Sequence, residues 1–392
     1  MNIMEKKFQK IRKNIPALNN QIYVNWGGAG PSPKRVIENI NTFLEWESEI
    51  GPFHPKVREK SIQLKQTLRE TISKIFKSTP DEIAITDNTT TGINIAASGI
   101  DWEKSDEVIV ANQEHPGGFL PWLVWSKRKN IKVKLLETGE SDEELINNLT
   151  RTITKFTKVV CISHISWLTG KIFPIELISK ICKKNSVLLV VDGAQSIGQK
   201  DIDIPKTGAD IYTISGQKWL MGPQGTGALY IRKNILKNIL LSRVTYGNAR
   251  LKNLNKLTFT PFSNAKKFEN GTTNIGLISG LIESLNLYHQ LGPSRIEKRI
   301  KNLTEKLVEL MQNEQRINIL SPIKKIESGI VSFSIQGIES SRVVELLLKR
   351  KIILREVEST PISARVSIHY VNTEKEIEDI ASSIIEIAQK QK

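Results

Sequence analysis

The sequence predicts an α/β protein with a seven-stranded, mostly parallel sheet and a smaller α+β domain in its C-terminal part. Two observations lead to this fold class. Short apolar, β-branched segments alternate with longer amphipathic segments up to about residue 290, as in sheets covered by helices on both faces. After that point, long helical segments and short strands follow in a mixed order.

Seven segments have the length and residue types of buried strands. They are residues 81–87, 106–112, 132–137, 158–166, 187–193, 210–215 and 226–231. In the C-terminal part, helices are predicted at 294–313, at 340–351 and from Glu374 onward, and strands at 329–337, 352–357 and 364–370. One core stops growing near roughly 250 to 300 residues, so we expect a large domain at 18–290 and a small one formed by 1–17 and 291–392.

Composition narrows the class of protein. Lys and Arg number 56 against 41 Asp and Glu, a net charge of +15, but the basic residues are dispersed and do not favour a nucleic-acid partner. Two cysteines cannot form a disulfide framework or a thiolate metal cluster, and we expect no metal. The sequence has neither a signal-peptide pattern nor an apolar run of the ~20 residues that span a bilayer. We therefore expect a cytoplasmic protein without a membrane partner.

Polar residues follow several predicted strands where each strand ends. In open parallel sheets, ligands bind beyond the carboxyl ends of the strands. The first strand leads to Thr89, Thr90 and Thr91, whose hydroxyls at a helix start suit a phosphate, although threonine is also an ordinary helix cap. The second strand leads to His115, where an imidazole could stack on a ligand, move protons or serve only the local structure.

The fifth and sixth strands end near ionisable groups. Asp192 follows an apolar strand and is costly to bury without a cationic partner, unless it only caps the next turn; Gln195 lies three residues further on. Lys218 follows the sixth strand, and a partly desolvated amine suits a Schiff-base nucleophile and general base. Pyridoxal phosphate (PLP) needs these groups together: a lysine, a carboxylate, a partner for its ring face, and hydroxyls for its phosphate.

The segments EHPGG (114–118), VVDGAQSIG (190–198) and SGQKWLMGPQGTGALYI (215–231) carry a family resemblance. In this order they resemble the class V aminotransferase family of fold-type I PLP enzymes, which includes cysteine desulfurases and cystine C-S lyases. YVNWGGAGPSPKRV (23–36), FENGTTNIGLISGL (268–281) and ARVSIHYVNTEKEIE (364–378) also match, so the resemblance covers nearly the whole chain.

The resemblance implies how the ring of PLP is held. Lys218 forms the covalent link to its aldehyde, Asp192 pairs with the pyridine nitrogen, and His115 stacks on the ring. Gln195 contacts the phenolic oxygen. We expect Lys218, His115 and Asp192 to be the catalytic residues.

The resemblance also implies how the phosphate is held. The expected contacts come from Thr89, Thr90, Ser215 and Gln217, although Gln217 stands where relatives often have histidine. Thr272 matches a residue that reaches the phosphate of the neighbouring subunit. A homodimer with shared active sites is therefore implied.

Three further residues bear on the substrate. Arg365 matches the arginine that fixes the substrate α-carboxylate, the alternative being a surface arginine in an edge strand. Arg355, on the preceding predicted strand, could contact a second carboxylate. Trp167 stands where relatives with desulfurase or transaminase activity commonly have asparagine, and its ring alters the pocket.

The missing loop cysteine decides the expected reaction. Desulfurases need a nucleophilic cysteine in the segment matching VESTPIS (357–363), whereas Cys161 and Cys182 lie in segments typical of a core. Together with Trp167, the two arginines, EHPGG and the segments EIGPF (49–53), ITDNTTTG (85–92) and GIDW (99–102), this absence makes the sequence resemble the cystine C-S lyase branch most closely. We expect β-elimination on cystine or cysteine, giving persulfide or sulfide, pyruvate and ammonia, without an enzyme thiol.

Several alternatives stay open. A desulfurase with an unrecognised nucleophile, or an aminotransferase or epimerase of the same family, is the nearest. A non-catalytic, polyanion-binding protein is more remote. Besides the sulfur amino acid and the second subunit, an iron–sulfur or persulfide acceptor protein is a candidate partner.

Overall fold

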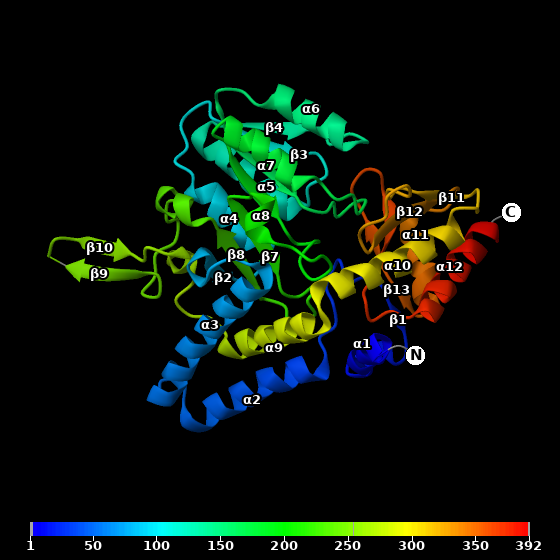
Figure 1. The fold of residues 1–392 in the computed structure, drawn as a ribbon, viewed down its shortest axis with the longest axis horizontal. Coiled ribbons are helices and arrows are strands. Elements are labelled where there is room, and N and C mark those ends of the chain that lie inside the picture. Colours follow the sequence, from blue (N-terminus) through cyan, green and yellow to red (C-terminus); the bar gives the residue numbers. More distant parts are fainter. Residues whose placement is uncertain (1–2, 254, 391–392) are drawn as a thin grey trace.

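A computed structural model describes residues 3–253 and 255–390, and it has a large mixed sheet, a smaller sheet and helices around both (Figure 1). The helices are α1 (Ile3–Lys13), α2 (Lys34–Ile50), α3 (Pro55–Phe76), α4 (Thr89–Gly99), α5 (Pro116–Lys129), α6 (Asp142–Thr152), α7 (Ile175–Lys184), α8 (Ile204–Thr207), α9 (Ile275–Leu291), α10 (Pro293–Met311), α11 (Ser340–Lys349) and α12 (Glu374–Gln389). None of these described helices combines the length and the apolar composition needed to cross a membrane.

The seven strands predicted in the first part of the chain all form, and they make one sheet. In spatial order they are β2 (Ile83–Thr86), β8 (Gly227–Ile231), β7 (Ile211–Ser215), β6 (Leu188–Asp192), β5 (Thr157–Ser163), β3 (Glu107–Ala111) and β4 (Lys132–Leu136). Neighbouring strands are parallel except at β8, which runs antiparallel to both β7 and β2. The predicted seven-stranded, mostly parallel sheet is confirmed.

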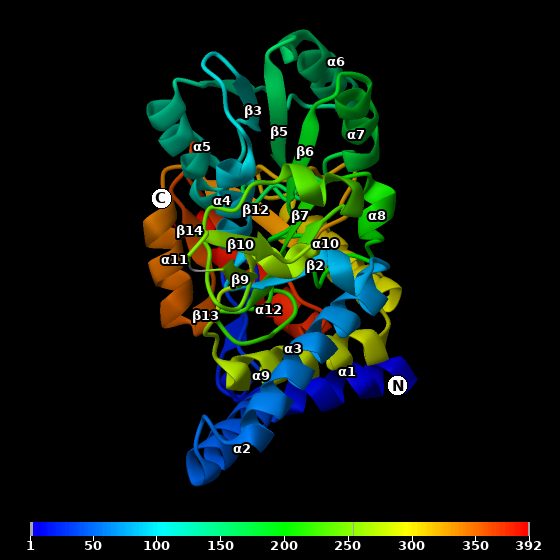
Figure 2. The same cartoon turned by 90° about the vertical axis from the view of Figure 1, so that its left-hand side faces the viewer.

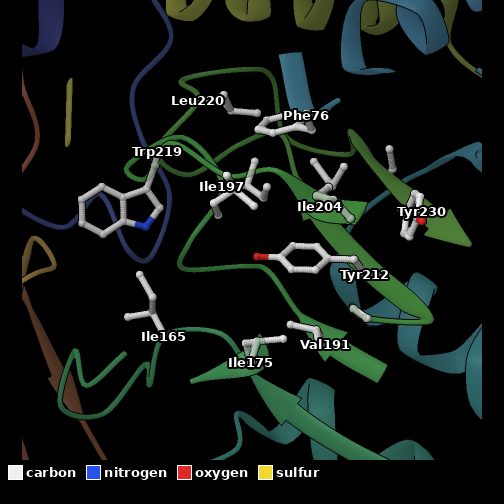
Figure 3. Close-up of a cluster of buried hydrophobic side chains, with 14 of the residues drawn as sticks. Phe76, Ile165, Ile175, Val191, Ile197, Ile204, Tyr212, Trp219, Leu220 and Tyr230 are labelled. Carbon is white, nitrogen blue, oxygen red and sulfur yellow. The ribbon is translucent and has the colours of Figure 1, made fainter. Parts of the chain in front are cut away.

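Helices cover both faces of this sheet, and successive strand residues point alternately to the two faces. Val108 and Val110 of β3 join one core with residues of α4 and α5, whereas Ile109 joins a second core with residues of α3, α6 and α7. Figure 2 shows β3, β5 and β6 between α5 on one side and α6 and α7 on the other. Figure 3 shows part of the second core, around Tyr212. Two covered faces leave the strand ends as the place where a ligand can enter.

The smaller sheet is antiparallel and carries its own core. Its spatial order is β11 (Ile317–Ile319), β12 (Ile330–Ile335), β15 (Ser363–Ser367) and β14 (Arg355–Val357). Apolar residues of α10, α11 and α12 pack against it, among them Leu307, Leu347 and Ile380. The predicted α+β pattern of the C-terminal part is confirmed, and the domain boundaries near residues 18 and 290 stay a prediction.

Two local features differ from the predicted elements. The segment 352–357 is two strands because its halves have different partners: β13 (Ile352–Ile353) pairs with β1 (Ile22–Tyr23), and β14 pairs with β15. A hairpin of β9 (Ala249–Asn253) and β10 (Thr258–Pro261), which was not predicted, projects from the large sheet's side of the molecule (Figure 1).

Candidate active site

The carboxyl ends of the parallel strands meet at a cavity of about 300 Å³. Most of the predicted site residues line it, namely Thr89, Thr90, His115, Trp167, Asp192, Gln195, Gln217, Lys218, Arg355 and Arg365. The rest of its described lining is Gly27, Gly28, Asn88, Ser163 and Ala194. Residues far apart in the sequence thus come together where the sheet topology predicts a ligand.

A larger cleft, of about 920 Å³, lies beside α7, α8 and the start of α10. It contains none of the predicted site residues. Two of its lysines already face carboxylates, because Lys200 pairs with Glu297 and the Lys77 Nζ lies 3.6 Å from Asp203 Oδ2. We therefore take the smaller cavity as the candidate active site.

Lys218 sits in a tight turn after β7. The turn closes through hydrogen bonds from Gly222 N to Gly216 O (2.8 Å) and from Met221 N to Lys218 O (3.0 Å). Burial lowers the pKa of Lys218 to about 8, with Asp192 opposing this shift and Arg365 and Arg355 adding to it. The amine is therefore partly neutral near physiological pH and available as a nucleophile or base.

Asp192 ends β6 and is buried. Its Oδ1 accepts hydrogen bonds from Ala194 N at 2.8 Å and from Thr213 Oγ1 at 3.3 Å, so this oxygen does cap the following turn. Burial raises the pKa of the carboxyl, which a cationic partner would reverse. Oδ2 has no hydrogen bond among those found for the described residues and stays available for such a partner.

Glu114 is a second acidic group beside Asp192, and it was not among the residues predicted from the sequence. Its carboxyl oxygens accept hydrogen bonds from Ser163 N at 2.5 Å and Ser163 Oγ at 2.7 Å. Burial, and then the charge of Asp192, raises the pKa of Glu114 to about 8. Glu114 is therefore held as a neutral acid at pH 7, next to the carboxylate that ends β6.

His115 and Trp167 both line the cavity, and their rings are in contact with each other. His115 Nδ1 accepts a hydrogen bond from Gly117 N at 3.0 Å, which caps α5 and leaves the proton of the neutral ring on Nε2. The two rings meet edge to face, with centroids 4.9 Å apart at 77°. Burial, followed by repulsion from Lys218, lowers the pKa of His115 to about 4, so the ring is neutral.

The threonines lie at the start of α4, but they do not cap it. Asn88 is the cap, since its Oδ1 accepts a hydrogen bond from Thr91 N at 2.8 Å, so the alternative of a threonine cap is wrong. Thr89 and Thr90 line the cavity beside this helix N-terminus. Unpaired N–H groups and hydroxyls at a helix start form a ready anion site.

Ser215 ends β7, and Gln217 lies two residues further along the chain. Ser215 does not line the cavity, but its Oγ donates to Gln217 Oε1 at 3.2 Å. With Oε1 occupied by this contact, Gln217 Nε2 stays available as a donor. Thr272 lies elsewhere: its Oγ1 is 3.0 Å from Tyr246 OH, and it does not line this chain's own cavity.

The two arginines form the basic wall of the cavity. Arg365 is completely buried in β15, which lies between β12 and β14, so the alternative of a surface arginine in an edge strand is wrong. Its Nη1 donates to Trp167 O at 2.8 Å, while Nε and Nη2 are buried without a partner. Arg355 lies 5.9 Å from the centre of the Trp167 ring. Unpaired buried donors of this kind call for an anionic ligand.

Both cysteines are buried away from the cavity. Cys161 lies within β5, and burial raises the pKa of its thiol well above the usual value. Cys182 lies in α7, where burial raises its pKa to about 12. Neither thiol has the exposed, electropositive setting of a reactive cysteine, which agrees with the prediction that both are core residues.

The fold and the site together define an α/β enzyme with a lysine, a carboxylate and an anion site at the ends of its parallel strands. Residues 22–380 match the family model Aminotransferase class-V. The chain belongs to this family, which confirms the predicted resemblance.

Relatives of similar length carry related names. A protein of Methanothermobacter thermautotrophicus named as a probable cysteine desulfurase is 28% identical, over 97% of this chain and 98% of its own length. One from Pyrococcus abyssi with the same name is 27% identical, over 97% of both chains.

Solved structures give the same fold. The cystine C-S lyase C-DES in complex with its reaction product, cysteine persulfide, has a TM-score of 0.89 and 28% identity, covering 95% of this chain and 99% of that chain. A C-DES mutant with glycine covalently linked to its PLP cofactor has a TM-score of 0.89 and 28% identity, over 96% and 99%. The apo cysteine desulfurase of Thermococcus onnurineus also has a TM-score of 0.89, at 26% identity over 99% of both chains. These matches confirm the predicted fold type.

Proposed function

We propose that this protein is a PLP-dependent carbon–sulfur lyase that performs β-elimination on cystine or cysteine. The products would be a persulfide or sulfide, pyruvate and ammonia. The observation that carries the proposal is the make-up of the cavity, which pairs Lys218 and Asp192 with two arginines and, in its described lining, contains no cysteine.

The residues of the cavity fit PLP. Asp192 keeps Oδ2 for the pyridine nitrogen, and the N-terminus of α4 with Thr89, Thr90 and Gln217 provides donors for the phosphate. Lys218 would hold the aldehyde, and His115 would lie against the ring. The C-DES relative, which has PLP in its solved structure, supports the same cofactor here.

When bound, PLP withdraws electrons from the bonds to the substrate α-carbon. The chain's own contribution is proton transfer and orientation. Lys218 Nζ, whose pKa burial lowers to about 8, would remove the α-proton. The carbon–sulfur bond then breaks, and the sulfur leaves with the bonding electrons. For cystine the leaving group is cysteine persulfide, and the remaining carbon skeleton hydrolyses to pyruvate and ammonia.

The arginines would orient the substrate. The free Nε and Nη2 of Arg365 suit a bidentate contact with the α-carboxylate. Arg355 would take the second carboxylate of cystine, and Trp167 would close the cavity between Arg355 and His115. Cystine, which has two carboxylates, therefore fits this wall better than cysteine.

A cysteine desulfurase is the second candidate function, because the curated relatives carry that name. It would require a thiol that accepts sulfur from the substrate. Cys161 and Cys182 are poor candidates because both are buried and the pKa of each thiol is raised.

Product analysis separates the two functions. Purified protein would be incubated with PLP and cystine or cysteine, and pyruvate and alanine would be quantified. The lyase proposal expects pyruvate and ammonia in equal amounts. Alanine without pyruvate would contradict it and support a desulfurase.

We also propose a homodimer in which Thr272 contacts the phosphate of the neighbouring subunit. Its supports are the family resemblance and the position of Thr272, which is outside its own cavity beside the exposed Tyr246.

A further inference from the structure

Gln195 is held at both ends of its amide by groups that the proposed mechanism does not use. Its Oε1 accepts a hydrogen bond from Trp219 Nε1 at 3.0 Å, and its Nε2 donates to Gly27 O at 2.9 Å. An indole N–H can only donate and a carbonyl can only accept, so these contacts fix the amide in one orientation. The second Nε2 proton remains for a ligand in the cavity that Gln195 lines.

The position of Trp219 is fixed by burial and by a contact with His369. Trp219 is completely buried, and its carbonyl oxygen lies 2.9 Å from Nε2 of His369. Burial lowers the pKa of His369 to about 3, so the neutral ring has a single N–H, which Nε2 donates to this carbonyl. His369 stacks on Trp26 with ring centroids 4.1 Å apart at 17°. Trp219, which donates to Gln195, is therefore held in place by the buried, stacked rings of His369 and Trp26.

The backbone at Gly27 lies very close to the side-chain amide of Gln195. A Cβ at this position would lie 2.9 Å from Gln195 Oε1 and 2.8 Å from Ser367 Oγ. Only glycine lets the N-terminal loop approach closely enough for the carbonyl oxygen of residue 27 to accept a hydrogen bond from Gln195 Nε2. Two anchors, one on each amide atom, thus prevent both a flip of the amide and a swing of its plane.

We infer that Trp219 is a positioning residue, which holds Gln195 so that its free Nε2 proton points at the phenolic oxygen of the cofactor. The inference rests on the proposed function, in which PLP binds in this cavity. Trp219 is joined by one peptide bond to Lys218. The same turn therefore sets both the covalent anchor of the cofactor and the donor to its oxygen.

The substitution Trp219→Phe tests this role, because it removes the indole N–H and keeps an aromatic ring. Without the Trp219 anchor the amide can swing about its contact with Gly27. Losing the contribution of a single hydrogen bond of this kind should raise the dissociation constant of PLP roughly two- to tenfold. A weakened donor also stabilises the negative phenolic oxygen less, so the pH midpoint of the bound cofactor's absorbance change should rise by roughly half to one unit.

Trp102→Phe is the matched control. Trp102 is buried and its Nε1 donates to Ala97 O at 2.7 Å, outside the cavity. Both substitutions should lower the melting temperature, because each removes a buried hydrogen bond. Only Trp219→Phe should change the absorbance midpoint and the PLP affinity. Trp219→Leu, which has no side-chain donor, provides the same test if Trp219→Phe does not fold.

A double-mutant cycle with Gln195→Ala shows whether the effect passes through Gln195. In that background, Trp219→Phe should change neither PLP affinity nor the absorbance midpoint. An unchanged single variant, or an equal effect with and without Gln195, would overturn the inference. Wild-type protein that binds no PLP would instead overturn the proposed function.

Discussion

Arg355 and Arg365 lie directly opposite each other across β14 and β15, and both line the candidate active site. Like charges in register destabilise a strand pair. Burial, and then the charge of Arg355, lowers the pKa of Arg365 to about 9. A substrate with two carboxylates would relieve this repulsion, and the pair therefore links the geometry of the site to the choice of substrate.

Arg355→Gln should raise KM for cystine roughly tenfold or more, because a charge-assisted hydrogen bond to the second carboxylate is lost. Steady-state kinetics with S-methylcysteine, which has one carboxylate, should change little. Arg350→Gln is the control, since Arg350 lies outside the cavity and pairs with Glu386. Equal losses on both substrates would exclude Arg355 as a group that selects cystine.

The lowered pKa of Lys218 predicts the pH dependence of cofactor loading. Only the neutral amine attacks an aldehyde. Since burial lowers the pKa of Lys218 from 10.5 to about 8, the rate of PLP incorporation into apo protein should rise about tenfold per pH unit below 8 and then level off. Stopped-flow absorbance measures this rate, and Lys218→Ala should show no incorporation. A rate that still rises above pH 9.5 would indicate an ordinary lysine.

Glu114→Gln should change how stability depends on pH. The pKa of Glu114 is raised from 4.5 to about 8, so between these values the folded protein keeps a proton that the unfolded chain releases. The stability of the wild type relative to Glu114→Gln must therefore fall as the pH rises between these two values.

Melting temperatures of the apo proteins at pH 5 and pH 8 measure this effect. From pH 5 to pH 8, the melting temperature of Glu114→Gln should rise relative to that of the wild type. Glu309→Gln, at an exposed position of α10, is the control. A difference between wild type and Glu114→Gln that does not change with pH would contradict the assignment of a neutral Glu114.

Subunit complementation tests Thr272. Thr272→Ala should weaken PLP binding, and Lys218→Ala should abolish its covalent attachment. A mixed dimer of the two variants then contains one site with Lys218 from one chain and Thr272 from the other. Co-expression with two affinity tags should restore wild-type affinity at half of the sites. A monomer in light scattering, or no restoration, would contradict a shared site.

The strand-end residues could be predicted because sheet topology brings the ends of parallel strands together. Asp192, His115 and Lys218 each follow an apolar strand, and they meet at one cavity. Most of the strands could also be predicted, because they are buried on both faces and appear in the sequence as short, mainly apolar segments. The edge strand β4 is partly exposed and contains two lysines.

Other features depend on partners that are distant in the sequence. Glu114 is bound by Ser163, 49 residues away, and Trp219 by Gln195, 24 residues away. No local pattern marks such pairs, although a carboxylate directly before His115 was a visible signal for Glu114. The opposition of Arg355 and Arg365 depends on strand register, which single-sequence patterns do not specify.

The most direct test of the proposed lyase uses protein without cysteine, Cys161→Ala together with Cys182→Ala. Incubated with PLP and cystine, it should release pyruvate and ammonia at the wild-type rate, because no thiol takes part in the elimination. Loss of sulfur release in this variant, with alanine as the wild-type product, would contradict the lyase and show that the chain works as a desulfurase.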